Sequence, residues 1–145
     1  ALVSAAFRLL AHPAIASLNL LNHYMALEVA GGSRIMAPLG VEQQEVWTLF
    51  FLQAHHYGYL LAGAFFGLHC FLLGILLRRS RHFPSIFGWL MMAAALGYLI
   101  ETFGSFLAPG NEVLLATIVG FSAAVGEVSL TVFLLVKGVN KPSTT

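Results

Sequence analysis

Ionisable and amide side chains lie deep inside apolar segments of this sequence. They are His23, His69, Glu101 and Glu127, with Asn19 and Asn22 beside the first histidine. Imidazole and carboxyl groups exchange protons and bind metals or haem, and inside a membrane an ionisable residue marks a functional site by default. These six residues are therefore the candidate intramembrane ligand or proton sites of the protein.

The composition places the chain in a membrane. Of its 145 residues, 59% are hydrophobic and only 9% are charged, whereas soluble domains carry about 25% charged residues. The net charge is +1, and without a long basic run a nucleic acid is not expected as a partner. Cys70 is the only cysteine, which excludes an internal disulfide framework and a cysteine cluster for metal.

Four segments are apolar and long enough to cross a bilayer, which needs about 20 residues. Their approximate ranges are 7–30, 55–77, 86–107 and 113–136. The polar stretches between the last three are short, so these neighbours should run antiparallel. We expect a single integral-membrane domain over 1–145, an all-α, polytopic transmembrane helix bundle. Residues 42–54, EQQEVWTLFFLQA, should form an interfacial segment with Trp47 near the lipid headgroups.

Basic residues are concentrated on one side of the expected bundle. Acidic residues gather on the opposite side, at Glu28, Glu42, Glu45 and Glu112. The loop after the second span and the tail after the fourth are instead basic, and cytoplasmic loops carry such an excess of lysine and arginine. We therefore expect the arginine loop and the C-terminus in the cytoplasm. The basic residues are Arg78, Arg79, Arg81, Lys137 and Lys141.

Small residues recur at helical spacing in three of the segments. Such rows let helix backbones approach each other inside a membrane. The second span contains Gly63, Gly67 and Gly74 together with Cys70. Gly97 lies in the third span on a face with Ala93, Gly104 and Ala108, and Gly120 in the fourth lies on a face with Ala116 and Ala124. We predict that these glycines form the helix-packing faces.

The two membrane glutamates lie close to the predicted packing faces. Glu101 is within about 60° of Gly97 and Gly104 around the helix, and Glu127 is within about 60° of Gly120, so neither should face lipid. Estimated from the centre of each span, Glu101 and His23 lie at one depth in the membrane, and Glu127 and His69 lie at another. We therefore expect these two pairs to interact. In the first span Arg8, His12, Asn19 and His23 form a polar row, which should face protein or a water-filled cavity.

Three interpretations of these polar groups stay open. They could form interhelical hydrogen bonds that specify which helices pair. They could line a path for a proton or a small substrate. They could also bind haem, since His55 and His69 lie fourteen residues apart on one helix face. The histidines of the first span, His12 and His23, are only eleven residues apart and do not lie at the depths of His55 and His69. No cofactor is therefore predicted, and haem is the least favoured alternative. Without a nucleophile triad, phosphate loop or HExxH metal motif, we do not expect an enzyme.

The order of several short pieces resembles a known family. The pieces are HHYGYL, FFGLH followed by LLG, then RS, P and G before the third span, GYLIETF, and GEVSLTVFLLVKGV. This arrangement is similar to the bacterial integral-membrane family known as domain of unknown function 4386. The resemblance covers nearly the whole chain and implies a six-span protein of which this chain holds the last four spans. It also implies that Ala1 is not the natural start, and it assigns no catalytic residue.

Together these features predict a non-enzymatic protein of the bacterial inner membrane. It would be an accessory or assembly subunit whose partners are the lipid bilayer and other membrane subunits, or further helices of the same protein. A proton-coupled small-molecule carrier that uses the intramembrane glutamates and histidines is the alternative.

Overall fold

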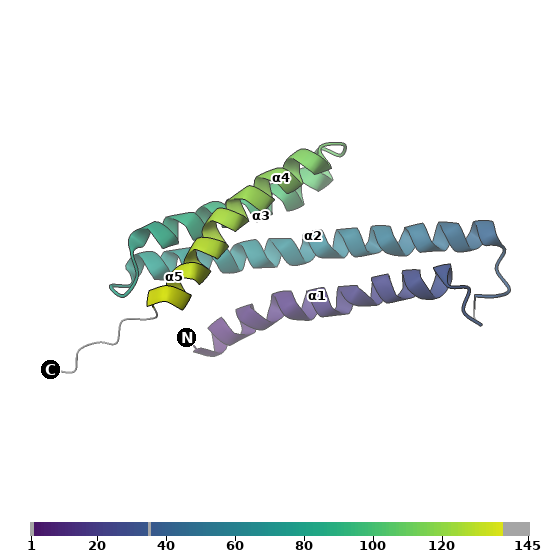
Figure 1. Ribbon diagram of the computed structural model, residues 1–145, viewed down its shortest axis with the longest axis horizontal. Coiled ribbons are helices and arrows are strands. Elements are labelled where there is room, and N and C mark those ends of the chain that lie inside the picture. The colour runs from purple at the N-terminus through teal and green to yellow at the C-terminus, as the bar shows by residue number, and fades with distance from the viewer. Residues whose placement is uncertain (1, 35, 138–145) are drawn as a thin grey trace. The chain divides into compact units, whose positions relative to one another are not determined.

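The computed structural model describes the backbone of residues 2–34 and 36–137 and the side chains of residues 12–34 and 36–137. Every regular element in these ranges is helical, which confirms the predicted all-α class. Figure 1 shows the helices in chain order. They are α1 (Leu2–Ala30), α2 (Val41–Arg79), α3 (Ser85–Leu107), α4 (Glu112–Ala123), the π-helical turn η1 (Ala124–Val128) and α5 (Ser129–Lys137).

Three helical stretches of the described residues are long and apolar enough to cross a membrane. They are Val41–Arg79, Ser85–Leu107 and Glu112–Lys137, the last being α4, η1 and α5 in succession. The first expected span, residues 7–30, is helical but is not among the three.

The expected interfacial segment does not form an element of its own. Residues 42–54 and the second span belong to one uninterrupted helix of 39 residues, roughly twice the length that a bilayer requires. The sequence of α2 contains no proline that would end it. The helices α1 and α3, by contrast, are each followed by a glycine with a positive φ angle. Gly32 (φ 60°) follows α1 and Gly110 (φ 95°) follows α3, and both adopt a left-handed conformation that glycine tolerates.

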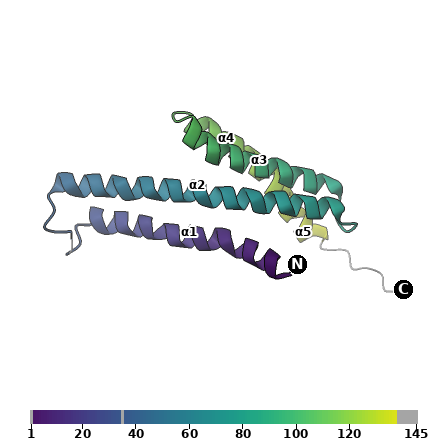
Figure 2. The ribbon, with the colours of Figure 1, turned by 180° about the vertical axis from the view of Figure 1, so that it is seen from behind.

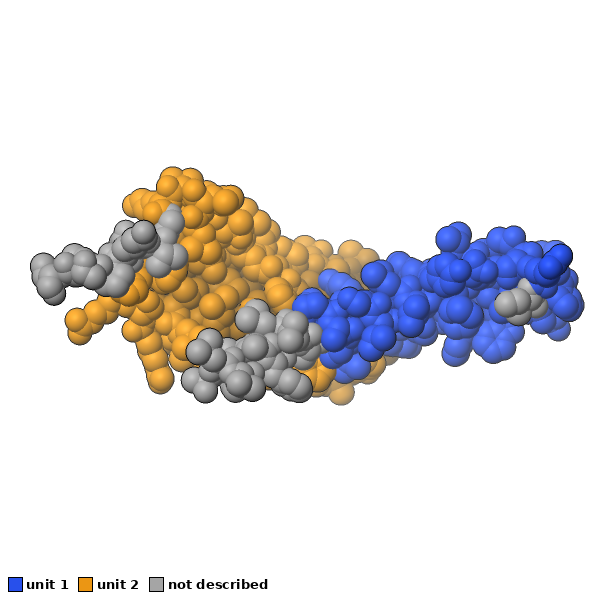
Figure 3. Space-filling view, turned by 90° about the horizontal axis from the view of Figure 1, so that it is seen from below, with its two compact units in different colours: residues 1–62 blue, residues 63–145 orange. Residues whose placement is uncertain are grey.

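The chain forms two compact units, residues 1–62 and 63–145, coloured separately in Figure 3. The boundary lies within α2. In the first unit, α1 and residues 41–62 of α2 form an antiparallel hairpin, visible from both sides in Figures 1 and 2. His12, near the start of α1, is hydrogen-bonded to Ala62, while Ala30, at the end of α1, lines a pocket with Val41.

In the second unit, α3 packs against residues 63–79 of α2 and also against α4 and η1. The buried cluster at its centre consists of Cys70, Leu77, Met91, Ala95 and Leu130. The predicted glycines of α2 lie on the face that meets α3. A Cβ atom added to Gly67 would lie 3.1 Å from the Cβ of Tyr98, and one added to Gly63 would lie 3.5 Å from Thr102 Oγ1.

The closest approach of two backbones joins Gly74 to Gly88. A Cβ atom on Gly74 would lie 2.7 Å from the carbonyl oxygen of Gly88, and one on Gly88 would lie 2.6 Å from that of Gly74. Gly88 was not singled out from the sequence, because it stands near the start of α3 and outside the row of Gly97 and Gly104. The backbones of α2 and α3 are therefore in contact next to the loop 80–84, which connects the two helices.

The predicted packing role of Gly120 is wrong within this chain. Gly120 is exposed, and a Cβ atom built on it would meet nothing within 4 Å. The face of α4 that packs on α3 instead carries Leu115 and Val119, both buried, and Ser122, which lies against Gly97. Gly120 is about 100° around the helix from Val119, which turns it away from α3.

Two alanine substitutions test this packing. Gly88→Ala should destabilise the protein by about 1–3 kcal/mol, because the added methyl group overlaps the α2 backbone. Gly120→Ala should be neutral or stabilising by about 0.5–1 kcal/mol, because alanine is the better helix former where space is free. Thermal unfolding of the two purified variants in detergent measures both effects. Equal unfolding temperatures for the two variants would contradict the assigned contact.

Candidate functional site

The most extensive polar arrangement lies in the first unit, where Asn19 of α1 meets His55 of α2. The Asn19 side-chain amide donates to the backbone carbonyl of His55 (2.8 Å), and the His55 ring nitrogen Nδ1 lies 3.1 Å from the backbone carbonyl of Asn19. Because a carbonyl oxygen can only accept, Nδ1 must carry the hydrogen and donate it. Two reciprocal bonds therefore fix the register of the hairpin. Asn19 is buried, with 7% of its surface exposed.

The other two predicted polar residues of α1 extend this arrangement. The Asn22 amide donates to the Asn19 side-chain oxygen (3.0 Å). The ring of His23 stacks on the ring of His55, with centroids 3.6 Å apart and planes 14° from parallel. The structure thus brings Asn19, Asn22 and His23 together around His55, a residue expected from the sequence at the membrane interface, with haem ligation as an alternative. The predicted pairing of His23 with Glu101 joins the two units and stays a prediction.

A groove of about 420 Å³ runs beside this contact in the same unit. It is lined by polar groups of His12, Asn19 and His55 and by apolar residues that include Pro13 and Leu20. The His12 ring nitrogen Nδ1 lies 3.0 Å from the carbonyl oxygen of Ala62. The polar row predicted on α1 therefore faces α2 at His12 and Asn19. Its fourth member, Arg8, lies outside the side chains that the structure describes.

Gly58 makes room for the Asn19 side chain. A Cβ atom at this position would overlap the Asn19 amide group. Gly58 does not belong to the row of Gly63, Gly67 and Gly74, so the small-residue pattern of α2 did not predict its role. Its spacing from His55, three residues along the same helix, places both on one face. That spacing could have identified Gly58 once the partner of His55 was known.

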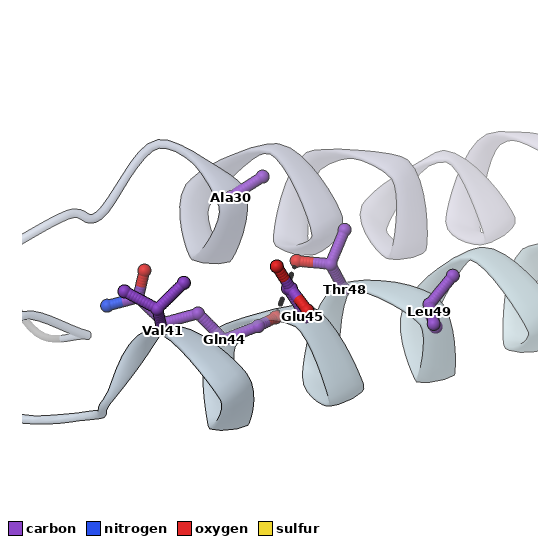
Figure 4. A pocket seen from close by; sticks show the side chains of 6 residues that line it. All are labelled: Ala30, Val41, Gln44, Glu45, Thr48 and Leu49. Carbon is purple, nitrogen blue, oxygen red and sulfur yellow. Dashed lines mark hydrogen bonds between the residues drawn. The ribbon is translucent and has the colours of Figure 1, made fainter.

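A second pocket of about 480 Å³ lies at the loop end of the same hairpin. Figure 4 shows Glu45 and Thr48 projecting from α2 toward the side where Ala30 of α1 lies. The Gln44 amide donates to the backbone carbonyls of Met36 and Leu39 in the loop, and Thr48 donates to the carbonyl of Gln44. These bonds attach the loop to α2. The pocket offers one carboxylate, Glu45, and that alone does not define a ligand site.

In the second unit, Glu127 accepts a hydrogen bond from the Tyr98 hydroxyl (2.9 Å). The sequence predicts a pair of Glu127 with His69, whereas in the structure the partner of Glu127 is Tyr98. His69 is half-buried beside the ring of Phe66, at 5.9 Å, and Phe66 in turn meets Tyr98 edge to face at 5.0 Å. The depth estimate assumed a regular helix, whereas Glu127 lies in the π-turn η1, which alters the direction of its side chain.

A close contact of Gly126 and hydrogen bonds of Ser129 and Thr131 accompany the π-turn. Gly126 is buried against α3, so close that a Cβ atom there would lie 2.9 Å from the carbonyl oxygen of Leu90. Ser129 donates its hydroxyl hydrogen bond to the carbonyls of Val125 and Gly126, and Thr131 donates to that of Glu127. Such bonds from serine and threonine to preceding carbonyls bend helices. Together they support the wide turn at Glu127.

Glu101 is buried on α3, with 8% of its surface exposed, beside the equally buried Thr102. Tyr98 lies one turn earlier on the same helix, so the polar groups of the second unit are concentrated along this part of α3. Among the described residues, no three histidine, cysteine, aspartate or glutamate side chains converge on a common metal position. The chemistry available at Tyr98 and Glu127 is hydrogen bonding and proton exchange between a phenol and a carboxyl group.

Comparison with known proteins identifies the family. The family described as "Domain of unknown function (DUF4386)" matches residues 1–138. The chain belongs to this family. Its membership confirms the resemblance seen in the order of HHYGYL, FFGLH and GYLIETF, and the description of DUF4386 names no activity.

One relative shows that similar sequences occur in archaea. A protein of Archaeoglobus fulgidus, described as "Uncharacterized protein", is 35% identical over 74 residues. The match covers 51% of this chain and 42% of the relative, so the chain spans less than half of that protein's length. No solved structure matches the chain. For this DUF4386 protein, the arguments about function therefore rest on its own side chains.

The contact between Asn19 and Gly58 can be tested by a double-mutant cycle. Asn19→Ala should destabilise the protein by about 1–2 kcal/mol, because the hydrogen bond to His55 is lost. Gly58→Ala should also destabilise it, because the new methyl group displaces the Asn19 amide. In the double variant the alanine at 19 leaves room for the methyl group, so the two costs should not add. Thermal unfolding in detergent gives the values, with Leu18→Ala as an exposed neighbouring control. Fully additive losses would show that the two residues do not meet.

Proposed function

We propose that this DUF4386 protein is a non-enzymatic accessory or assembly subunit of a bacterial inner membrane. The observation that supports this most directly is the character of α1. It is a helix of 29 residues, long enough to cross a bilayer, and it carries the polar side chains of Asn19, Asn22 and His23. A helix of this kind is stable in a membrane when protein covers its polar side.

The exposed face of α1 supports the same proposal. Ser17 and Tyr24 are seven residues apart and share one face. Both are exposed, as is His23 at the edge of that face. Hydroxyl and imidazole groups are poorly accommodated by hydrocarbon. We infer that helices of other membrane subunits, or further helices of the same protein, contact this face.

The buried polar residues support a structural role for the site. Asn19 is bonded to His55 across two helices, and Tyr98 is bonded to Glu127 across two others. In lipid, each such bond contributes about 0.6 kcal/mol on average but specifies which helices pair and in which register. In this proposal no cofactor is bound and nucleic acid is not a partner. The region with Arg79 and Arg81 faces the cytoplasm, and so does the C-terminus, as the excess of basic residues there indicates.

Site-specific photo-crosslinking in native membranes tests the subunit proposal. A photoreactive residue at Ser17 or Tyr24 should yield a protein adduct of one defined mass, recovered in constant ratio. The same residue at Phe121, which is 74% exposed on α4, should yield lipid adducts only. Adducts within the same chain would assign the contact to its own helices. Lipid adducts alone at Ser17 and Tyr24 would overturn the proposal.

A proton-coupled carrier is the second candidate, favoured by the position of Glu127. π-Turns inside α-helices occur frequently at functional sites, and this one holds a half-buried carboxyl group against the Tyr98 hydroxyl. A carboxyl group bonded to a phenol inside a membrane can take up and release a proton.

Proton flux into liposomes tests the carrier. If the protein carries protons, a potassium diffusion potential should drive proton entry that is abolished in Glu127→Gln and reduced in Tyr98→Phe. Glu42→Gln, at the exposed start of α2, serves as the control with unchanged flux. Flux that is the same with and without the protein would remove this candidate and leave the structural role of the pair.

A further inference from the structure

An apolar groove of about 610 Å³ runs along the outer face of the second unit. Phe87 of α3 forms one wall, and one face of η1 and α5 forms the other. The helical residues that line it recur every three or four positions, as expected for a single helix face. They form four adjacent pairs, each four residues after the last: Ala124 and Val125, Val128 and Ser129, Val132 and Phe133, Val136 and Lys137.

The groove has an aromatic floor and an exposed rim. The rings of Phe87 and Phe133 are 4.6 Å apart, and Phe133 is half-buried. The valines at the rim are exposed, Val132 by 51% and Val136 by 76%. Ser129, the one neutral polar residue of the lining, uses its hydroxyl for the backbone carbonyls of its own helix. The body of the groove thus offers apolar contact alone.

One end of the groove is cationic. Lys137 lines that end, one helical turn beyond Phe133. The ring of Phe83 lies 6.1 Å from that of Phe133, and Arg81 and His82 directly precede Phe83 in the loop. Nearby, the guanidinium carbon of Arg78 lies 3.9 Å over the ring of Trp89, and tryptophan is enriched at the membrane interface.

Acidic residues lie away from this end. The unit contains three glutamates and no aspartate. Glu127 is ten residues before Lys137, about 15 Å along the helix, and is bonded to Tyr98. Glu112 stands at the opposite end of α4, and Glu101 lies six residues before the far end of α3. Among the described residues of this unit, the three glutamates therefore lie away from Lys137.

The groove has the length of one lipid leaflet. The helical lining extends from Ala124 to Lys137, thirteen steps of 1.5 Å or about 20 Å. Half of a bilayer, headgroups included, measures about 20–22 Å. An apolar trough of this length that ends in basic side chains is complementary to a lipid with a negative headgroup.

We propose that this groove binds an anionic phospholipid. One acyl chain lies along Phe133 and the valine rim, and the phosphate lies between Lys137 and Arg81. The groove is lined by residues of the second unit alone, so the proposal stands whether or not the protein is a subunit of a larger assembly.

Native mass spectrometry of the detergent-purified protein with added phosphatidylglycerol or phosphatidylcholine tests the proposal. The wild-type protein should retain phosphatidylglycerol preferentially. The double variant Lys137→Gln/Arg81→Gln should weaken that binding about thirtyfold, as expected for two basic residues at a lipid surface, and leave phosphatidylcholine unchanged. Lys137→Arg should bind as the wild type does, which separates loss of charge from loss of folding.

The groove itself is tested by filling it. Val132→Trp should abolish retention of phosphatidylglycerol, whereas Leu114→Trp, on an exposed part of α4, should not. Equal retention of the two lipids by the wild-type protein would overturn the proposal. Binding that depends on the charges but survives Val132→Trp would reduce the site to a headgroup contact and overturn the assignment of the groove. A photoreactive residue at Val132 that captures a protein instead of lipid in native membranes would show that a helix occupies it.

Discussion

The close approach of backbones along α3 is the constraint on which the second unit depends. Without a hydrophobic force between helices in lipid, association rests on van der Waals contact and hydrogen bonds, and both require short distances. Gly88 meets Gly74 on one side of α3, and Gly126 meets Leu90 on the other. Each contact leaves no room for a Cβ atom. The π-turn at Glu127, its bond to Tyr98 and the groove beside Phe133 all follow from how closely α4, η1 and α5 lie against α3.

The first unit is held together in a different way. Its hairpin has a reciprocal hydrogen-bonded contact at Asn19 and His55, and Gly58 supplies the space for it. This arrangement makes α1 polar where it meets α2. Glycines therefore have different roles in the two units. In the second unit they allow helix backbones to come into contact, and in the first Gly58 leaves space for the Asn19 side chain.

Much of this architecture could be predicted from composition and periodicity. The membrane location, the helical class, the approximate ends of α3 and of the last helical stretch, and the packing face of α2 with Gly63, Gly67 and Gly74 all follow from patterns within one segment, whereas the start of α2 at Val41 does not. The partners of the polar residues could not be predicted in the same way. His23 stacks on His55, and Glu127 is bonded to Tyr98 rather than His69. Both depend on the rotation of one helix against another and, at Glu127, on a turn that is not α-helical.

The sequence by itself determined that the chain is a family member, a membrane protein and a set of helices, because these properties depend on local hydrophobicity and on the order of short motifs. The tertiary structure alone decided that Gly88 and Gly126 pack and Gly120 does not, that Gly58 makes room for Asn19, and that Phe87 of α3 and Lys137 of α5 line one groove. The physical reason is that hydrophobicity is a sum over neighbouring residues, whereas contact is decided by which faces of different helices meet at distances of a few ångströms.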